Sequence, residues 1–120
     1  HEYRTEIDPA GMILTGGAAA AGNVVMRTLC NPGDEVIVLA PFFPEYKFYI
    51  EQAGGTMVLV QTDDQFQPDI AAIEAAINEH TRAIIVNTPG STKGCIEQLD
   101  AVIDVLPHAL RLLADTETGH

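Results

Sequence analysis

Residues 84–94, which read IIVNTPGSTKG, pass from a buried apolar run into a loop of glycine, hydroxyl side chains and one lysine. A loop of this composition after a strand raises the question of phosphate binding. In a nucleoside-triphosphate loop, a glycine-lysine pair is followed by serine or threonine at the start of a helix. Here Lys93 comes before Gly94, and no hydroxyl residue follows the lysine directly. The order of residues therefore argues against a triphosphate loop.

Two glycines earlier in the chain are a second candidate for ligand binding. Gly16 and Gly17 stand between an apolar run and an alanine-rich segment, where free backbone amides at a helix start could bind an anion. The alternative for this pair is a tight turn that lets small residues pack. No Gly-x-Gly-x-x-Gly sequence occurs at this point, so a dinucleotide site is not indicated.

Aromatic and acidic residues mark two further positions. The segment PFFPEY at residues 41–46 gathers Phe42, Phe43 and Tyr46. Such rings either stack on a planar ligand or belong to the core. Asp115 follows an apolar run, and its carboxylate could pair with a protonated ring nitrogen or a cation, or could cap an element in solvent.

Short apolar runs alternate with helical patterns along the chain, without a repeat or a low-complexity linker. This alternation predicts a single α/β domain over residues 1–120, with an open, mainly parallel sheet and helices on its faces. Ligands of such sheets bind beyond the carboxyl ends of the strands, where the candidate residues lie. The expected strands are Met12–Thr15, Glu35–Ala40, Met57–Val60, Arg82–Asn87 and Leu110–Ala114; the expected helices are the alanine-rich segment up to Cys30, Pro44–Ala53, a helix opened by Pro68 with Ile70, Ile73 and Ile77 on one face, and a helix carrying Leu99, Val102, Ile103 and Leu106.

Composition excludes several classes of partner. The chain of 120 residues has 6 Lys+Arg against 17 Asp+Glu, a formal net charge of −11, which disfavours nucleic acid and anionic membranes as partners. No apolar run approaches the roughly 20 residues that cross a bilayer, so we expect a soluble, cytoplasmic protein. Cys30 and Cys95 lack the spacing of a zinc or redox site, and the four histidines are scattered. We therefore expect no metal site and two reduced thiols.

The order of these features is more specific than any one of them. Residues 17–55 read GAAAAGNVVMRTLCNPGDEVIVLAPFFPEYKFYIEQAGG, and residues 66–89 read FQPDIAAIEAAINEHTRAIIVNTP. With these motifs in this order, the sequence closely resembles the large domain of the pyridoxal-phosphate-dependent aminotransferases of class I/II, fold type I. The resemblance implies transfer of an amino group between an amino acid and a 2-oxo acid, with pyridoxal 5'-phosphate as cofactor and a homodimer as the assembly.

The resemblance assigns the cofactor phosphate to the start of the alanine-rich helix. Gly17, Ala18 and Ala19 match the residues that bind the phosphate in the family, largely through backbone amides. Many relatives carry a hydroxyl or amide side chain where this chain has Ala19, so one phosphate hydrogen bond is expected to be missing.

The resemblance also assigns residues to the cofactor ring. Phe43 matches the aromatic residue that stacks on the pyridine, and Asp115 matches the aspartate that keeps the ring nitrogen protonated, with Tyr46 as that aspartate's partner. The family usually reads Pro-Asn-Asn-Pro-Thr-Gly where this chain has residues 89–94. Ser91 stands at the second asparagine, which bonds the phenolic oxygen of the cofactor, and its shorter hydroxyl would lose that bond or make it through water.

The lysine that bonds to the cofactor lies beyond the aspartate in this family, and it has no match here. Lys47 and Lys93 are expected to be solvated. We therefore expect a fragment of a large domain that is inactive alone and self-associates through its uncovered surfaces. The alternatives are a non-catalytic α/β binding module that lost the cofactor loop, and an unrelated small phosphate-binding α/β protein.

Overall fold

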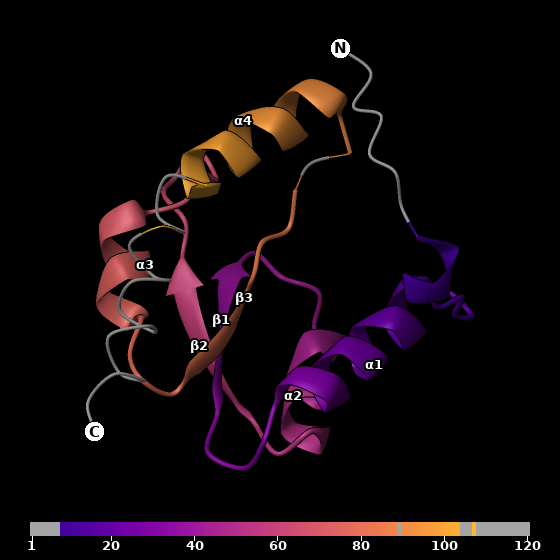
Figure 1. Cartoon of the computed structure of the whole chain (residues 1–120). Helices are drawn as coiled ribbons and strands as arrows, with labels where there is room; N and C mark the ends of the chain where they lie inside the picture. The colour runs from indigo at the N-terminus through magenta and orange to yellow at the C-terminus, as the bar shows by residue number, and fades with distance from the viewer. Residues whose placement is uncertain (1–7, 89, 104–106, 108–120) are drawn as a thin grey trace.

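A three-stranded parallel sheet stands at the centre of the computed structural model, which describes residues 8–88, 90–103 and 107 (Figure 1). The strands are β1 (Glu35–Ala40), β2 (Thr56–Gln61) and β3 (Thr81–Ile85), in the spatial order β2-β1-β3. The predicted α/β fold with a parallel sheet is confirmed.

The central strand β1 is the most buried element of the chain. Its residues Val36, Ile37, Val38 and Leu39 are almost fully buried. A continuous run of β-branched and apolar residues suits a strand that is covered on both faces. β1 is also the central strand and pairs with both neighbours, with Val38 opposite Leu59 of β2 and Ile85 of β3.

Helices cover the two faces of the sheet separately. α1 (Ala18–Leu29) and α2 (Glu45–Gln52) lie on one face, and α3 (Ile70–Ala76) lies on the other (Figure 1). Each face has its own core because alternate residues of β1 point to opposite sides. The α1/α2 face is built from Met26, Cys30, Val36, Val38 and Ile50, and the α3 face from Ile37, Leu39, Val60, Ile73 and Ile77.

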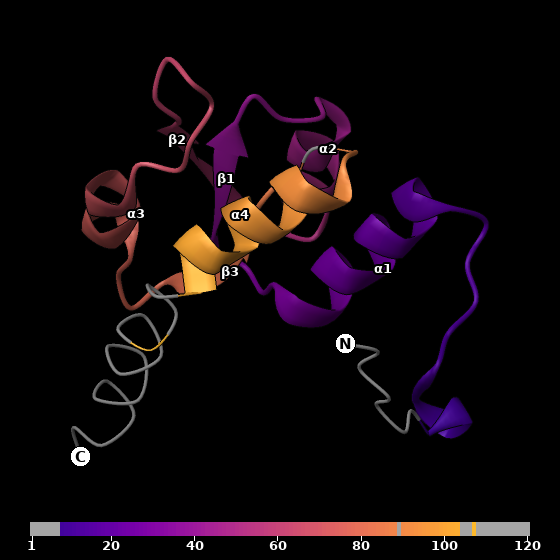
Figure 2. The same cartoon turned by 90° about the horizontal axis from the view of Figure 1, so that it is seen from above.

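The last described helix, α4 (Thr92–Ile103), lies beyond the carboxyl ends of the strands (Figures 1 and 2). Its residue Val102 is buried, and the side-chain amide of Gln98 donates a 3.1 Å hydrogen bond to the Phe66 carbonyl oxygen, between β2 and α3. α4 is thus attached to the edge of the sheet where ligands bind in parallel α/β folds.

An ion pair joins two strands at their amino ends, on the side of the sheet away from α4. The Asp34 carboxylate, just before β1, accepts hydrogen bonds from the Arg82 guanidinium at 3.2 and 3.3 Å and from the Asn31 backbone amide at 2.8 Å. These interactions, led by the Arg82 hydrogen bond, lower the pKa of Asp34 below its ordinary value. The amino ends of β1 and β3 are therefore joined by a charge-assisted contact.

The expected strand Met12–Thr15 was wrong. Residues 12–15 have no regular structure, and Met12, Ile13 and Leu14 are 57%, 78% and 94% exposed. A strand needs a neighbour that supplies its hydrogen bonds, and the described sheet ends at β2 and β3. The expected strand Leu110–Ala114 lies outside the described residues.

The helices and the two cysteines of the described residues were compared with the expectations from sequence. None of the helices in residues 8–88 and 90–103 has the length and apolar character that a bilayer crossing requires. Cys30 and Cys95 are both free thiols, and burial raises the pKa of the Cys30 thiol. The expectation of two reduced cysteines agrees with this arrangement.

Candidate functional site

The start of α1 presents backbone amides that have no acceptor within the helix. Gly17 precedes α1 with φ of 124°, a conformation that favours glycine, and no side chain caps the helix. Ala21 is the first residue whose amide bonds back along the chain, to the Gly17 carbonyl at 3.0 Å. The amides of Ala18, Ala19 and Ala20 therefore remain at the positive end of the helix dipole, and an anion fits there.

An aromatic pair lies at the start of α2. The rings of Phe43 and Tyr46 meet edge to face, with centroids 5.9 Å apart and planes inclined by 70°. Phe43 is 50% exposed, so part of its side chain is accessible to a ligand. A planar ligand gains stacking energy on such a ring.

A chain of hydrogen bonds joins this aromatic pair to the ends of two strands. The Tyr46 hydroxyl donates to Asn87 Oδ1 at 2.9 Å, and Asn87 Nδ2 donates to the Pro41 carbonyl oxygen at 3.1 Å. Asn87 follows β3 and Pro41 follows β1. Both polar groups of the Asn87 side chain are thereby used to fix Tyr46 at the carboxyl edge of the sheet.

A cavity of about 260 Å³ lies between the start of α1 and Tyr46, one member of the aromatic pair. Ala18 of α1, Tyr46 and Tyr49 of α2, and Ile85 of β3 are among the residues that line it. The Tyr49 hydroxyl donates to the Glu45 carboxylate at 2.6 Å, and this hydrogen bond raises the pKa of Tyr49. Ala18, predicted at the cofactor phosphate, and Tyr46, predicted as the partner of Asp115, thus line the same cavity.

Ser91 serves as a cap for α4. Its Oγ accepts a 3.2 Å hydrogen bond from the Gly94 amide, and its carbonyl oxygen accepts one of 2.9 Å from Cys95. The loop expected to run to Gly94 therefore ends at Ser91, because a serine before three helical residues satisfies a free amide of the first turn. The side chain of Ser91 is exposed, and the described structure gives it no contact with the aromatic pair.

Both lysines of the chain lie on the surface. Lys47 of α2 and Lys93 in the first turn of α4 are exposed, and each faces a glutamate four residues on, Glu51 at 3.8 Å and Glu97 at 3.7 Å. Neither lines the cavity at the start of α1. Asp115, the expected partner of a ring nitrogen, lies outside the described residues.

The role of Asn87 in fixing Tyr46 was not predicted from the sequence. A signal was present, because a carboxamide directly after a buried apolar run sits where parallel strands present ligand-binding residues. The sequence gives no indication that the partner would be Tyr46, since 41 residues separate the two in the chain.

The sequence profile of a known family, Aminotransferase class I and II, matches residues 1–116 of the chain. The chain belongs to the class I and II aminotransferases. Among the relatives of this aminotransferase chain, the aspartate/prephenate aminotransferase of Thermus thermophilus is 33% identical over 99% of the chain and 32% of its own length. The aspartate aminotransferase of Thermotoga maritima is 34% identical over 78% of the chain and 26% of its own length.

Solved aminotransferase structures show the same fold. A crystal structure of an aminotransferase from Eubacterium rectale superimposes on 82% of this chain with a TM-score of 0.72 and 36% sequence identity, and the matched part is 26% of that structure. The resemblance inferred from the order of motifs is therefore confirmed. This aminotransferase chain spans between a quarter and a third of the length of the curated relatives described above.

Proposed function

We propose that this chain supplies the phosphate-binding and ring-binding surface of a pyridoxal-phosphate-dependent aminotransferase. The enzyme would move an amino group from an amino acid to a 2-oxo acid. The observation that carries the proposal is the cavity shared by Ala18 at the start of α1 and Tyr46 of α2. It sets the free amides at the start of α1 beside an aromatic residue, and a phosphorylated aromatic cofactor would use both.

The start of α1 fits the phosphate of the cofactor. A Cβ added at Gly17 would meet no atom within 4 Å, so the approach to the neighbouring amides is open. The amides of Ala18, Ala19 and Ala20 would donate to phosphate oxygens, with the helix dipole adding to the attraction. The methyl group of Ala19 adds no donor, so the phosphate would depend on backbone groups alone.

The aromatic pair fits the cofactor ring. Phe43 would stack on the pyridine, and the hydrogen bond from Tyr46 to Asn87 would hold the pair in place. Pyridoxal phosphate, when bound, supplies an electron-withdrawing ring that stabilises negative charge at the substrate carbon. We keep Asp115 as the proposed partner of the ring nitrogen and Ser91 as the proposed neighbour of the phenolic oxygen.

We also propose that amino-group transfer needs a lysine beyond the two in this chain. Lys47 and Lys93 are exposed and lie against glutamates, so neither is placed to bond with a cofactor in the cavity. A reactive lysine normally lies in a desolvated pocket or beside another cation, whereas both lysines of this chain are exposed beside carboxylates. The chain by itself would then bind cofactor without turnover.

Binding of pyridoxamine 5'-phosphate tests the proposal. This amino form of the cofactor has no aldehyde, so its binding does not depend on a lysine. By calorimetry, the chain should bind it at least about tenfold more tightly than pyridoxamine, because only the phosphorylated molecule uses the amides of α1. Equal affinity for the two compounds, or a preference for a nucleoside triphosphate over both, would contradict the proposal.

We further propose that copies of this chain self-associate. Apolar side chains remain exposed on α1, at Val24 and Leu29, and on α4, at Ile96 and Ile103. The outer edges of β2 and β3 also have no neighbouring strand among the described residues. Exposed apolar surface and open strand edges both favour association.

A further inference from the structure

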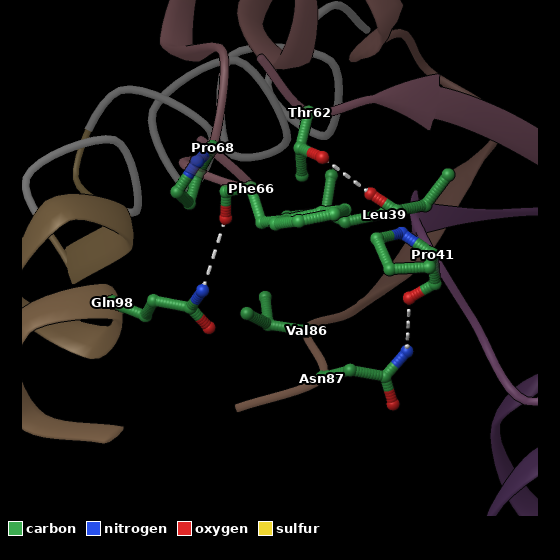
Figure 3. Close-up of a pocket in the computed structure, with 9 residues that line it drawn as sticks. Leu39, Pro41, Thr62, Phe66, Pro68, Val86, Asn87 and Gln98 are labelled. Atoms are coloured by element: carbon green, nitrogen blue, oxygen red, sulfur yellow. Dashed lines mark hydrogen bonds between the residues drawn. The ribbon is translucent and has the colours of Figure 1, made fainter. Parts of the chain in front are cut away.

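A second cavity, of about 250 Å³, lies beneath α4 on the side of the sheet covered by α3 (Figure 3). We call it the Gln98 cavity. Its walls include Leu39 and Pro41 at the end of β1, Val86 and Asn87 after β3, Phe66, and Gln98 of α4. It is separate from the cavity at the start of α1, which lies on the other face of the sheet and is lined by none of these residues.

The walls of the Gln98 cavity are mainly apolar. Leu39 and Val86 close it from the sheet, and Pro68 and the exposed ring of Phe66 lie on the α3 side. Phe66 has a φ of 60°, which is strained for an aromatic residue, and the Asp63 carbonyl holds it there through a 2.9 Å hydrogen bond from the Phe66 amide. An apolar cavity of about 150 Å³ is large enough for benzene, so this one accommodates a single aromatic ring with a substituent.

The Gln98 side chain brings one unsatisfied acceptor into this apolar space. The residue is 9% exposed, and its Nε2 donates to the Phe66 carbonyl oxygen at 3.1 Å. Its Oε1 is buried and has no hydrogen-bond partner among the described residues. Figure 3 shows the amide pointing between Phe66 and Val86, into the cavity. Leaving a buried acceptor without a donor costs about 1–3 kcal/mol of free energy. A ligand that donates a hydrogen bond to Oε1 would remove this cost and gain affinity.

The other polar side chains of the wall already have partners. The Thr62 hydroxyl donates to the Ala40 carbonyl oxygen at 2.7 Å. Asn87 donates to Pro41 and accepts from Tyr46. Among the polar side chains of the wall, Gln98 Oε1 is therefore the acceptor that selects for a hydrogen-bond donor.

Charge around the cavity disfavours anions. Asp63 and Asp64 line a hollow that adjoins it and shares Pro41, Thr62 and Phe66 with it. The cavity wall offers no cationic side chain to offset them. An anionic ligand would lose its hydration in an apolar space and meet two carboxylates nearby.

We propose that the Gln98 cavity binds a small uncharged ligand that is apolar over most of its surface and donates one hydrogen bond to Gln98 Oε1. A phenol is the simplest compound with these properties. The proposal does not depend on cofactor binding at α1, because it rests on residues of the opposite face of the sheet.

A pair of probes and a pair of variants test the inference. Phenol and toluene have similar size and shape, but only phenol donates a hydrogen bond. Gln98→Leu keeps the volume of the side chain and removes the acceptor. Gln52→Leu makes the same change at an exposed position of α2 and serves as the control. Binding would be followed by chemical-shift changes in the amide spectrum of the labelled chain, which also shows that each variant is folded.

Phenol should shift amides around Leu39, Phe66 and Gln98 in the wild-type chain. Gln98→Leu should weaken phenol binding about tenfold, as expected for one buried hydrogen bond, while leaving toluene binding equal or tighter. Gln52→Leu should change neither. The proposal is overturned if phenol binds equally to wild type and Gln98→Leu, if the shifted amides lie elsewhere, or if neither probe binds.

A crystal of the wild-type chain soaked with phenol gives a test that needs no variant. The phenol oxygen should lie about 2.7 Å from Gln98 Oε1. A water molecule on Oε1 with no phenol in the cavity would overturn the proposal.

Discussion

The Tyr46 hydroxyl lies 2.9 Å from Asn87 Oδ1 and donates a hydrogen bond to it, joining the first turn of α2 to the residues after β3. The Asn87 side chain in turn donates a hydrogen bond to the carbonyl oxygen of Pro41, which follows β1. One side chain thus fixes the aromatic pair against the carboxyl ends of two strands. The proposed ring-binding surface depends on this connection.

Removal of the Tyr46 hydroxyl should lower stability. Tyr46→Phe leaves Asn87 Oδ1 without its donor in a part-buried position, and we expect the free energy of unfolding to fall by about 1 kcal/mol. A double-mutant cycle with Asn87→Ala, measured by urea unfolding, should give a coupling energy of about the same size. Tyr49→Phe is the matched control. Its hydroxyl bonds to Glu45 within α2 in an exposed position, so the loss should be smaller. A coupling energy near zero would show that the hydrogen bond does not hold the two elements together.

The contact between Asp34 and Arg82 should make stability depend on pH. Arg82 lowers the pKa of Asp34 in the folded chain, so the contribution of this carboxylate is present above the unfolded pKa of about 3.9. It is lost as the pH falls through the lowered folded pKa. Asp34→Asn should therefore cost about 1 kcal/mol at pH 7, a modest amount because the Arg82 side chain is half exposed. The difference between wild type and variant, measured by urea unfolding, should shrink below about pH 4. A difference that stays constant down to pH 2 would contradict this account.

Elements with strong local signals were predicted well from the sequence. Glu35–Ala40 was predicted and observed with the same bounds, because a continuous β-branched run suits a strand covered on both faces. α2 also agrees, since Pro44 precedes it and Gly54 follows it. The strand Met12–Thr15 was not observed. An apolar run forms a strand only beside another strand that supplies its backbone hydrogen bonds, and the local sequence does not show whether such a neighbour exists.

The core of the α3 face should respond strongly to truncation. Ile73 is fully buried and packs with Ile37, Leu39 and Val60. Ile73→Ala removes three carbons from this cluster and should cost about 2–5 kcal/mol. Ile96→Ala on the exposed side of α4 should change the unfolding free energy by less than about 0.5 kcal/mol. If urea unfolding showed similar losses in the free energy of unfolding for the two variants, the buried core position of Ile73 would be contradicted.

Self-association should depend on the exposed apolar residues of α1. Val24→Gln together with Leu29→Gln replaces exposed apolar side chains with polar ones that suit a helix. We expect the dissociation constant of the assembly to rise at least about tenfold, because each exposed leucine or valine that becomes buried contributes about 1.5–3 kcal/mol. Light scattering over a range of concentrations measures this. An unchanged mass distribution would place the contact elsewhere.

The site was predicted less completely than the fold. The helix after Gly17 was predicted from its alanine-rich sequence, while its role in phosphate binding was implied by the family resemblance and stays a prediction. Phe42, Phe43 and Tyr46 were predicted as an aromatic group. Asn87 as the anchor of Tyr46 and Gln98 as a buried acceptor were not, because both depend on contacts between segments distant in sequence. Ser91 was expected near a cofactor ring, but its hydroxyl caps α4, a role that competes with ligand binding for the same group.

The central claim is that backbone amides at the start of α1 bind the cofactor phosphate. Ala19→Asp and Ala19→Asn test it most directly, because both side chains suit the first turn of a helix and have nearly the same shape, and only aspartate repels a phosphate. By calorimetry, Ala19→Asp should weaken the binding of pyridoxamine 5'-phosphate at least about tenfold relative to Ala19→Asn, while leaving pyridoxamine unaffected. Equal affinities of the two variants for pyridoxamine 5'-phosphate would contradict the account.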